Sequence, residues 1–428
     1  MRVPISGRDT RKAVEAGLRQ RRRKEAVFRT FGLLATGVGI VFLGVFFLSL
    51  FTQGASAFRQ TFIELEIEYS EDELAPGGDL DLEYADYDAL VRNALRQAFP
   101  EVTDRRELRE LVRLVSASAG FQLRDAVLRD PDLVGTRQRV LVPASSTVDM
   151  LAKGKVDRDL VADQRSLSDQ QINWVDQLEK RGNLQMKFNT GFFTNGDSRD
   201  PEMAGIKGAL MGSFYMLIVT IALSFPLGVA AAIYLEEFAP KNRWSDLIEV
   251  NINNLAAVPS IVFGLLGLAV FINWFGMPRS APLAGGLVLA LLTLPVIIIA
   301  ARASIQAVPP SIREAAFGIG ASRMQVVFHH VVPLALPGML TGAIIGMSRA
   351  LGETAPLLMI GMVAFIVDIP AGFSDPATAL PVQIFLWADS PERAFAERTS
   401  AAIIVLLGFL LLMNLAAIIL RKKVDRQW

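Results

Sequence analysis

The chain has 428 residues, of which 52% are hydrophobic, and its 43 Lys and Arg balance its 43 Asp and Glu. A mean hydropathy of +0.37 is high for a soluble globular protein, yet long stretches are dense with charge, which indicates two kinds of material in one chain. The absence of cysteine excludes disulfides, thiolate metal sites and a cysteine nucleophile. Zero net charge argues against a nucleic-acid partner only if the charges are evenly mixed.

Long charge-free stretches are the main architectural signal. Six of them exceed the roughly 20 residues that a transmembrane helix requires. They predict six transmembrane helices, and the alternative, a large soluble core, would need six buried helices of spanning length. The stretches lie between Arg29 and Arg59, Lys207 and Glu236, Glu249 and Arg279, Arg279 and Arg302, Arg323 and Arg349, and Arg398 and Arg421.

The first predicted helix covers residues 30–51 and follows a basic segment, residues 1–29. A cleaved signal peptide is the alternative, but the apolar run from Phe31 to Phe51 exceeds the roughly 7 to 15 residues typical of one, which favours an uncleaved anchor. The positive-inside rule places both termini in the cytoplasm, because the tail at residues 421–428 is also basic. The basic amino terminus is interpreted as an orientation signal near anionic lipid.

Residues 52–200, called the α+β module below, then lie outside the cytoplasm and are expected to form a small folded domain. Apolar residues alternate with acids from Ile63 to Tyr69 and from Leu80 to Tyr84, which predicts two half-exposed strands. Eleven acids and no Lys or Arg occur between Glu64 and Asp88. Tyr84 stands where a calcium-binding loop needs glycine, so a solvated acidic face is favoured over a calcium site.

Helices are expected in the same module around residues 90–99 and 108–115, where apolar residues follow helical spacing. Ser168 and Gln171 have the spacing of a capping box, which predicts a helix that begins there and ends before Gly182. The remaining chain is assigned to a membrane domain, residues 201–420. Its predicted helices cover about 208–235, 250–272, 281–302, 334–366 and 399–420, with a cytoplasmic loop at 307–333.

Several catalytic signatures are missing. The chain has no G-x-x-x-x-G-K-[ST] loop, so it is not expected to hydrolyse ATP itself, and neither H-E-x-x-H nor G-x-S-x-G occurs. His329 and His330 are adjacent and would point apart on a helix, so they are interpreted as structural. The sequence predicts neither a metal site nor an enzyme.

The predicted cytoplasmic loop contains a short helix with an unusually small-sided face. This helix is expected to follow Ser311, to carry Glu314, Ala315 and Ala316, and to end at Gly320. Small side chains allow close approach to a cleft in another protein, with Glu314 at the positive end of the helix.

A charged pair lies near the middle of the predicted fifth helix, residues 334–366. Arg349 and Glu353 are one turn apart and are expected to pair, which neutralises charges that are costly in a membrane. Pro356 cannot donate to the carbonyl of Gly352 and is expected to kink the helix there. A buried structural ion pair remains an alternative, but a polar path through the membrane is favoured.

These segments resemble a known family. The E-A-A-x-x-x-G pattern at residues 314–320 is similar to the coupling loop of ABC importer permeases, which docks on the ATPase subunit. The runs at residues 254–262 and 352–358 resemble the PstA-type permease of phosphate-specific ABC transporters. Where the family usually has Ile-x-Leu-Pro, residues 330–333 keep only the proline and an apolar valine. The resemblance covers roughly Gly191 to the carboxyl terminus, and the α+β module looks like the extension of a longer subgroup, with no role assigned.

The resemblance implies an all-α, MetI-like bundle of six transmembrane helices in the bacterial inner membrane, with a periplasmic α+β domain inserted after the first. It implies import of inorganic phosphate by alternating access. The implied partners are a PstC-like second permease, a PstB-like ATPase dimer that holds ATP and magnesium, and a periplasmic phosphate-binding protein. This chain itself is expected to bind no cofactor.

Phosphate chemistry suits the charged pair. A guanidinium such as that of Arg349 offers a planar fork of donors to phosphate oxygens, and Glu353 would neutralise it when the path is empty. Thr354 is assigned to the same pathway, and Arg302 is either an exit contact or a snorkelling anchor. Three alternatives stay open: a permease for phosphonate, molybdate or sulfate, a transporter or channel without an ATPase, and a membrane-anchored interaction protein.

The zero net charge is a cancellation between the two parts of the chain. Residues 52–200 carry 27 acids and 19 bases, a net charge of −8, and the remainder carries +8. The acidic module would give an incoming anion no long-range attraction, so a carrier would have to deliver phosphate.

Overall fold

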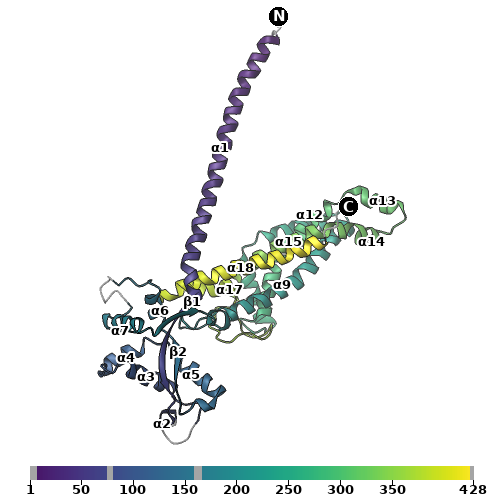
Figure 1. Cartoon of the computed structure of the whole chain (residues 1–428). Coiled ribbons are helices and arrows are strands. Elements are labelled where there is room, and N and C mark those ends of the chain that lie inside the picture. Colours follow the sequence, from purple (N-terminus) through teal and green to yellow (C-terminus); the bar gives the residue numbers. More distant parts are fainter. Residues whose placement is uncertain (1–6, 75–80, 159–165, 425–428) are drawn as a thin grey trace. The chain divides into compact units, whose positions relative to one another are not determined.

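A computed structural model describes residues 7–74, 81–158 and 166–424, which form two compact units, residues 1–53 and 54–428. The first unit consists of α1 (Gly7–Gly54), drawn in purple in Figure 1. It is longer than the predicted helix 30–51, because the basic segment before the apolar run is also helical from Gly7. Phe28, Phe42 and Leu48 are among its exposed apolar side chains.

The second unit contains the α+β module and the membrane domain. The module is built around a three-stranded antiparallel sheet in the order β2-β1-β3. Its central strand β1 runs along β2 from Phe62 opposite Pro143 to Glu68 opposite Arg137. The elements up to the membrane domain are η1 (Ala55–Phe58), β1 (Arg59–Glu68), α2 (Glu71–Leu74), α3 (Tyr87–Ala98), α4 (Arg105–Val112), α5 (Ser118–Arg129), η2 (Pro131–Leu133), β2 (Arg137–Pro143), α6 (Ser146–Ala152), α7 (Asp169–Lys180), β3 (Leu184–Phe188) and α8 (Gly191–Thr194).

The alternating pattern of β1 is confirmed, since Ile63, Leu65 and Ile67 are fully or almost fully buried while the intervening acids lie on the other face. The second predicted strand is wrong: residues 82–84 form a turn, and Leu80 lies outside the described residues. The central strand β1 already pairs with β2 and β3 on its two sides, and residues 82–84 do not pair with either outer strand. The predicted helices around 90–99 and 108–115 are α3 and α4.

The capping box predicted for α7 is also confirmed. The Gln171 backbone N–H donates to Ser168 Oγ at 3.2 Å, and the Ser168 N–H donates to the Gln171 side chain at 3.0 Å. Gly182 follows the helix with a φ of +76°, a conformation that suits glycine. The buried face of α7, including Trp174 and Leu178, packs into the core of the module.

The membrane domain is a helix bundle in which α9, α12, α15 and α18 pack alongside one another (Figure 1). The module joins one end of this bundle, and α13 and α14 lie at the other. The elements are α9 (Lys207–Ile233), the π-turn η4 (Tyr234–Phe238), α10 (Arg243–Ala256), α11 (Ser260–Gly267), the π-turn η5 (Leu268–Trp274), α12 (Pro282–Gln306), α13 (Pro310–Gly318), α14 (Arg323–Val326), the π-turn η6 (Val327–Val331), α15 (Val332–Gly352), α16 (Ala355–Met359), α17 (Leu380–Ala388) and α18 (Arg393–Val424).

Glycines at four-residue spacing bring α15 close to α12. A Cβ on Gly338 would lie 2.3 Å from the hydroxyl oxygen of Ser304, and one on Gly342 would lie 2.4 Å from the Cβ of Ala300. Gly346 continues the same stripe. Small residues drive such contacts between membrane helices, because lipid tails supply no hydrophobic force between helices.

Two predicted membrane helices are not continuous. Within the described residues, five helices are long and apolar enough to span a membrane. The predicted helix 250–272 is instead a bent helix pair, in which α10 and the α11–η5 segment meet at 100° before Ser260, as in a broken span or a re-entrant loop. Pro259 explains the break, since the residue before a proline is disfavoured in helical geometry. The predicted helix 334–366 is wrong in its second half, because α15 ends at Gly352.

We expect Ser168→Ala to lower the local stability of α7 by about 1 kcal/mol, the usual effect of losing an N-cap oxygen. Its first-turn amides should then exchange hydrogen roughly fivefold faster in the full-length protein, as measured by mass spectrometry. Ser166→Ala, at an exposed serine two residues earlier, is the matched control. Equal exchange rates in the two variants would contradict the capping role.

Candidate functional site

The charged pair forms at the point where α15 ends. Arg349 Nε donates to Glu353 Oε1 at 3.4 Å. Glu353 no longer has helical geometry, with φ −76° and ψ 120°, and α16 begins two residues later. The Arg349 side chain is 42% exposed and that of Glu353 is 18% exposed. Within the described residues only Nε of Arg349 has a protein partner, so the two terminal nitrogens of the guanidinium remain available to a ligand.

Pro356 ends the helix rather than kinking it. It lies in the first turn of α16, where its missing N–H costs no hydrogen bond. The bent helix pair packs against this turn: a Cβ on Gly264 of α11 would lie 2.6 Å from the Cα of Pro356. Thr354 occupies the N-cap position of α16 but makes no capping hydrogen bond through its side chain. The charged pair therefore sits at a break in α15 that is held by close packing with α11.

A polar contact supports the same turn of α15 from behind. Ser348 Oγ lies 2.8 Å from Asn414 Oδ1 on α18, one residue before Arg349. Thr341, about two turns nearer the amino end of α15, accepts a hydrogen bond from Arg421 of α18 at 3.0 Å. These contacts link α18 to the helix that carries Arg349. Asn414 and Ser348 could not be identified from the sequence, because they are 66 positions apart and no local pattern connects them.

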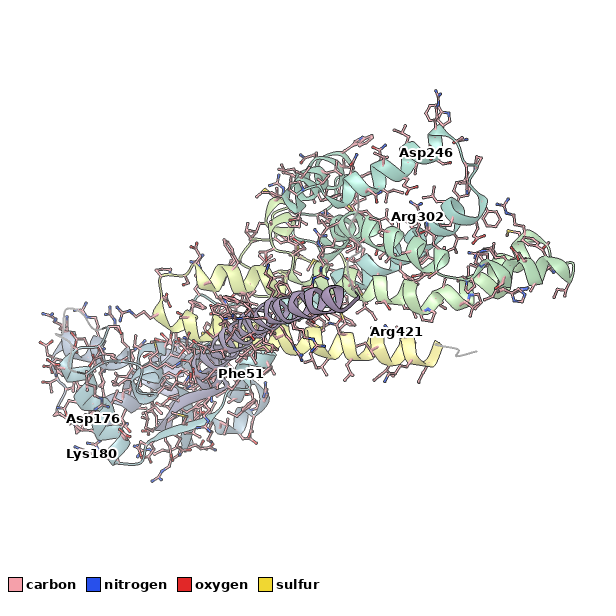
Figure 2. All side chains as sticks on the ribbon, turned by 90° about the horizontal axis from the view of Figure 1, so that it is seen from above. Phe51, Asp176, Lys180, Asp246, Arg302 and Arg421 are labelled. Carbon is pink, nitrogen blue, oxygen red and sulfur yellow. The ribbon has the colours of Figure 1, made fainter. Side chains whose placement is uncertain are left out.

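Arg302 lies on α12, where Figure 2 labels it, and its guanidinium pairs with carboxylates of two other elements. Its Nε is 2.5 Å from Glu236 of η4, and its Nη2 is 2.9 Å from Glu249 of α10. The Arg302 and Glu236 side chains are only 14% and 15% exposed. Two carboxylates thus occupy the guanidinium. The predicted roles of exit contact and lipid anchor remain predictions, and this pairing argues for a structural contribution from Arg302.

The E-A-A segment forms the helix α13, as predicted for residues after Ser311. Gly320 follows with a φ of +90°. Arg313 anchors the helix, since its Nη2 donates to Glu237 of η4 at 2.8 Å and its Nη1 donates to the carbonyl of Val308 at 2.7 Å. Arg323 also donates to the carbonyl of Glu237. Sequence reasoning missed these two arginines, although both lie beside the motif.

One side of α13 is buried and the other is exposed. Ala316 packs against the bundle core, whereas Glu314 and Ala315 face solvent. Phe317 and Ile319 are 49% and 83% exposed, which is unusual for apolar side chains on a polar loop. The motif therefore presents a small, mostly apolar surface around one carboxylate.

No group of three or more His, Asp or Glu in the described part of the chain has the arrangement of a metal site. His329 and His330 lie in the π-turn η6, which leads into α15. Their assigned structural role remains an interpretation.

Comparison with known proteins identifies the family. Residues 224–428 match the binding-protein-dependent transport system inner membrane component family. The phosphate transport system permease protein PstA 1 of Mycobacterium tuberculosis is 32% identical over 217 residues, 51% of this chain and 70% of that protein. The chain belongs to the PstA-type permease family. PstA of Yersinia pestis is another relative, 30% identical over 51% of this chain and 73% of that protein.

Other similarities to this PstA-type permease are more limited. The probable ABC transporter permease protein YqgI of Bacillus subtilis is 36% identical, but the match covers 39% of this chain and only 56% of YqgI. Residues 15–162 match a domain of unknown function, DUF3333, which includes most of the α+β module. An inward-facing structure of the MetNI methionine ABC transporter aligns with 50% of this chain and 95% of that chain, at 18% identity and a TM-score of 0.41.

We expect Arg302→Ala to destabilise the membrane domain by about 2–3 kcal/mol, because it leaves the mostly buried carboxylate of Glu236 without its cation, whereas the half-exposed Glu249 is still solvated. The free energy of unfolding in detergent micelles would measure this loss. Arg243→Ala, at an exposed arginine on α10, should change it little. If the two variants were equally stable, Arg302 would have no structural role, and this result would favour its predicted role as an exit contact.

Proposed function

We propose that this PstA-type permease is one half of an ATP-driven importer that moves inorganic phosphate across the bacterial inner membrane. The single observation that carries this proposal is the position of Arg349, a partly exposed guanidinium at the break between α15 and α16. The names of the PstA relatives support phosphate as the substrate.

The chemistry of the pair suits a transient phosphate site. Phosphate near neutral pH carries between one and two negative charges, and a guanidinium can donate two parallel hydrogen bonds to its oxygens. Glu353 holds Nε of Arg349 and balances its charge when no anion is present. When phosphate arrives, the same carboxylate limits the affinity by repulsion, so that the anion can leave again. A site for transport has to release its ligand as well as bind it.

The exposure of Arg349 supports a second permease subunit. A guanidinium that is 42% exposed on the side of one bundle would be costly if it faced lipid. A PstC-like chain packed against this face would cover it and complete the path. Both termini would be cytoplasmic and the α+β module periplasmic, with phosphate delivered there by a binding protein because the acidic module does not attract anions.

Energy would enter through α13. An ATPase dimer that binds ATP and magnesium would dock on the exposed surface formed by Glu314, Ala315, Phe317 and Ile319. Arg313 ties this helix to Glu237 of η4, which follows α9 directly, so movement of α13 would pull on the bundle. Alternating access would then follow from rigid movement of helices around the break at Glu353.

Arg349→Ala and Glu353→Ala should each lower phosphate uptake by reconstituted complex at least about tenfold, because each removes one member of a charge-assisted pair. Radiolabelled phosphate in proteoliposomes measures uptake, and copurification of the other subunits confirms assembly. Arg279→Ala, an arginine outside the described ion pairs, is the control. Wild-type uptake in both pathway variants would contradict the assignment. Uptake of phosphonate, molybdate or sulfate by the wild-type complex, with no uptake of phosphate, would favour another oxyanion.

The coupling surface has its own test. Phe317→Ala should weaken copurification of the ATPase roughly tenfold or more, as for a central aromatic in a protein interface. Glu314→Ala should do the same to a smaller extent, while the permease itself stays folded because both side chains are exposed. Phe121→Ala removes a comparably exposed phenylalanine from α5 of the α+β module and should leave ATPase binding intact. Retention of the ATPase by the Phe317 variant would exclude α13 as the docking site.

A further inference from the structure

A buried ion cluster joins the α+β module to the last membrane helix. Lys153, at the end of α6, lies 2.6 Å from Asp149 and 2.9 Å from Glu397 on α18. The three side chains are between 4% and 8% exposed. Lys155 adds a second cation, 3.3 Å from Glu397. Charges are rarely buried so completely unless they are paired. Separating α6 from α18 would leave a buried charge without its partner, so the contact favours this arrangement of the two helices.

Neighbouring contacts extend the cluster on both sides. Asp149 also accepts a hydrogen bond from the backbone N–H of Thr61 on β1 at 2.8 Å, which ties the cluster to the sheet. Arg398, the residue after Glu397, is buried; its guanidinium lies 5.6 Å from the ring centroid of Phe192 and donates to the carbonyl of Glu202 at 3.4 Å. Burial raises the pKa of the Glu202 carboxyl. The other terminal nitrogen of Arg398 has no partner within the described residues.

The junction is packed on one side and open on the other. A cleft of about 720 Å³ lies between the module and the start of α18, and its lining includes Met150, Pro201, Glu202 and Arg393. A movement of the module into this cleft would separate Lys153 from Glu397. In the structure the ion cluster is intact and the cleft is open; closing the cleft would require the cluster to break.

The opposite part of α18 contacts the proposed phosphate path. Asn414 lies against Ser348, the residue before Arg349, and Arg421 donates to Thr341 of the same helix. Both contacts lie on α15, so a displacement of α18 would reach the turn that carries Arg349. Figure 2 shows Arg421 towards the end of α18 that is remote from the module.

We propose that the α+β module is a control element of the permease, which holds α18 through the Lys153–Glu397 contact and thereby sets the position of Arg349. This inference rests on the proposed transport function. It gives the module a role that the membrane domain alone does not require: its position on the bundle decides how efficiently ATP hydrolysis is coupled to anion movement.

Glu397→Gln tests the first link, because it keeps the shape of the side chain and removes its charge. In the complete reconstituted complex, amides of α6 and of the first turns of α18 should exchange hydrogen faster than in the wild type. The number of phosphate ions imported per ATP hydrolysed should fall at least about fivefold, the lower end of usual allosteric coupling. Glu101→Gln, at an exposed carboxylate of the α+β module that does not line the cleft, should change neither quantity.

Asn414→Leu tests the second link and does not touch the module. It should lower the number of phosphate ions imported per ATP hydrolysed (the import ratio) while leaving hydrogen exchange at α6 unchanged. If the Glu397 variant does not accumulate, Asn414→Leu remains as the test. An unchanged import ratio in Asn414→Leu, or in a Glu397→Gln protein whose α6 has loosened, would overturn the proposal. Unchanged exchange at α6 in Glu397→Gln would overturn it as well.

A wild-type complex that imports no phosphate would contradict the proposed function instead. The stimulation of ATP hydrolysis by the binding protein would then measure the control role. Equal stimulation in the wild type and Asn414→Leu would overturn that role independently of the substrate.

Discussion

The close approach of α12 and α15 is the constraint on which the rest of the membrane domain depends. Gly338 and Gly342 face the small side chains of Ser304 and Ala300 so closely that a Cβ at either glycine would collide with them. The larger residues of α15 are therefore directed to its other sides, towards α18 and towards the break before α16. Helices that approach each other this closely through small residues do not need a wide apolar contact surface. The remaining sides of α15 can therefore carry polar groups.

Polar groups in such a bundle must find their partners inside the protein, because lipid provides none. The structure meets this requirement with pairs from different elements. Arg302 takes Glu236 and Glu249, Arg313 takes Glu237, and Ser348 lies against Asn414. Arg349 differs from these residues because its local partner occupies only one nitrogen and its side chain is considerably exposed. Arg302 is held by two carboxylates from other elements, whereas Arg349 has donors left for a ligand.

Local properties could be predicted from the sequence, and properties set by distant neighbours could not. Charge-free length predicted α9, α12 and α18, and the capping of α7 depends only on Ser168, Gln171 and Gly182. Whether α15 bends or ends at Pro356 depends on what lies beside it, and the close contact with Gly264 of α11 is not visible locally. The Arg349–Glu353 pair was predictable from its four-residue spacing, whereas the glutamates that hold Arg302 are 53 and 66 residues away in the chain.

The buried ion pairs at the junction with α18 change how the acidic module is understood. Its charge suggested a solvated appendage, and the paired acids of β1, such as Glu68 with Arg137 at 2.7 Å, fit that description on one face. Surface pairs of this kind contribute little to stability. The pairs at the junction with α18 are different, because Lys153 and Glu397 are almost completely desolvated and have no water to compensate a lost partner. A module that was only loosely attached to the bundle would not need to bury charged side chains at its attachment point. The burial of Lys153 and Glu397 therefore argues that the position of the module on α18 matters for function.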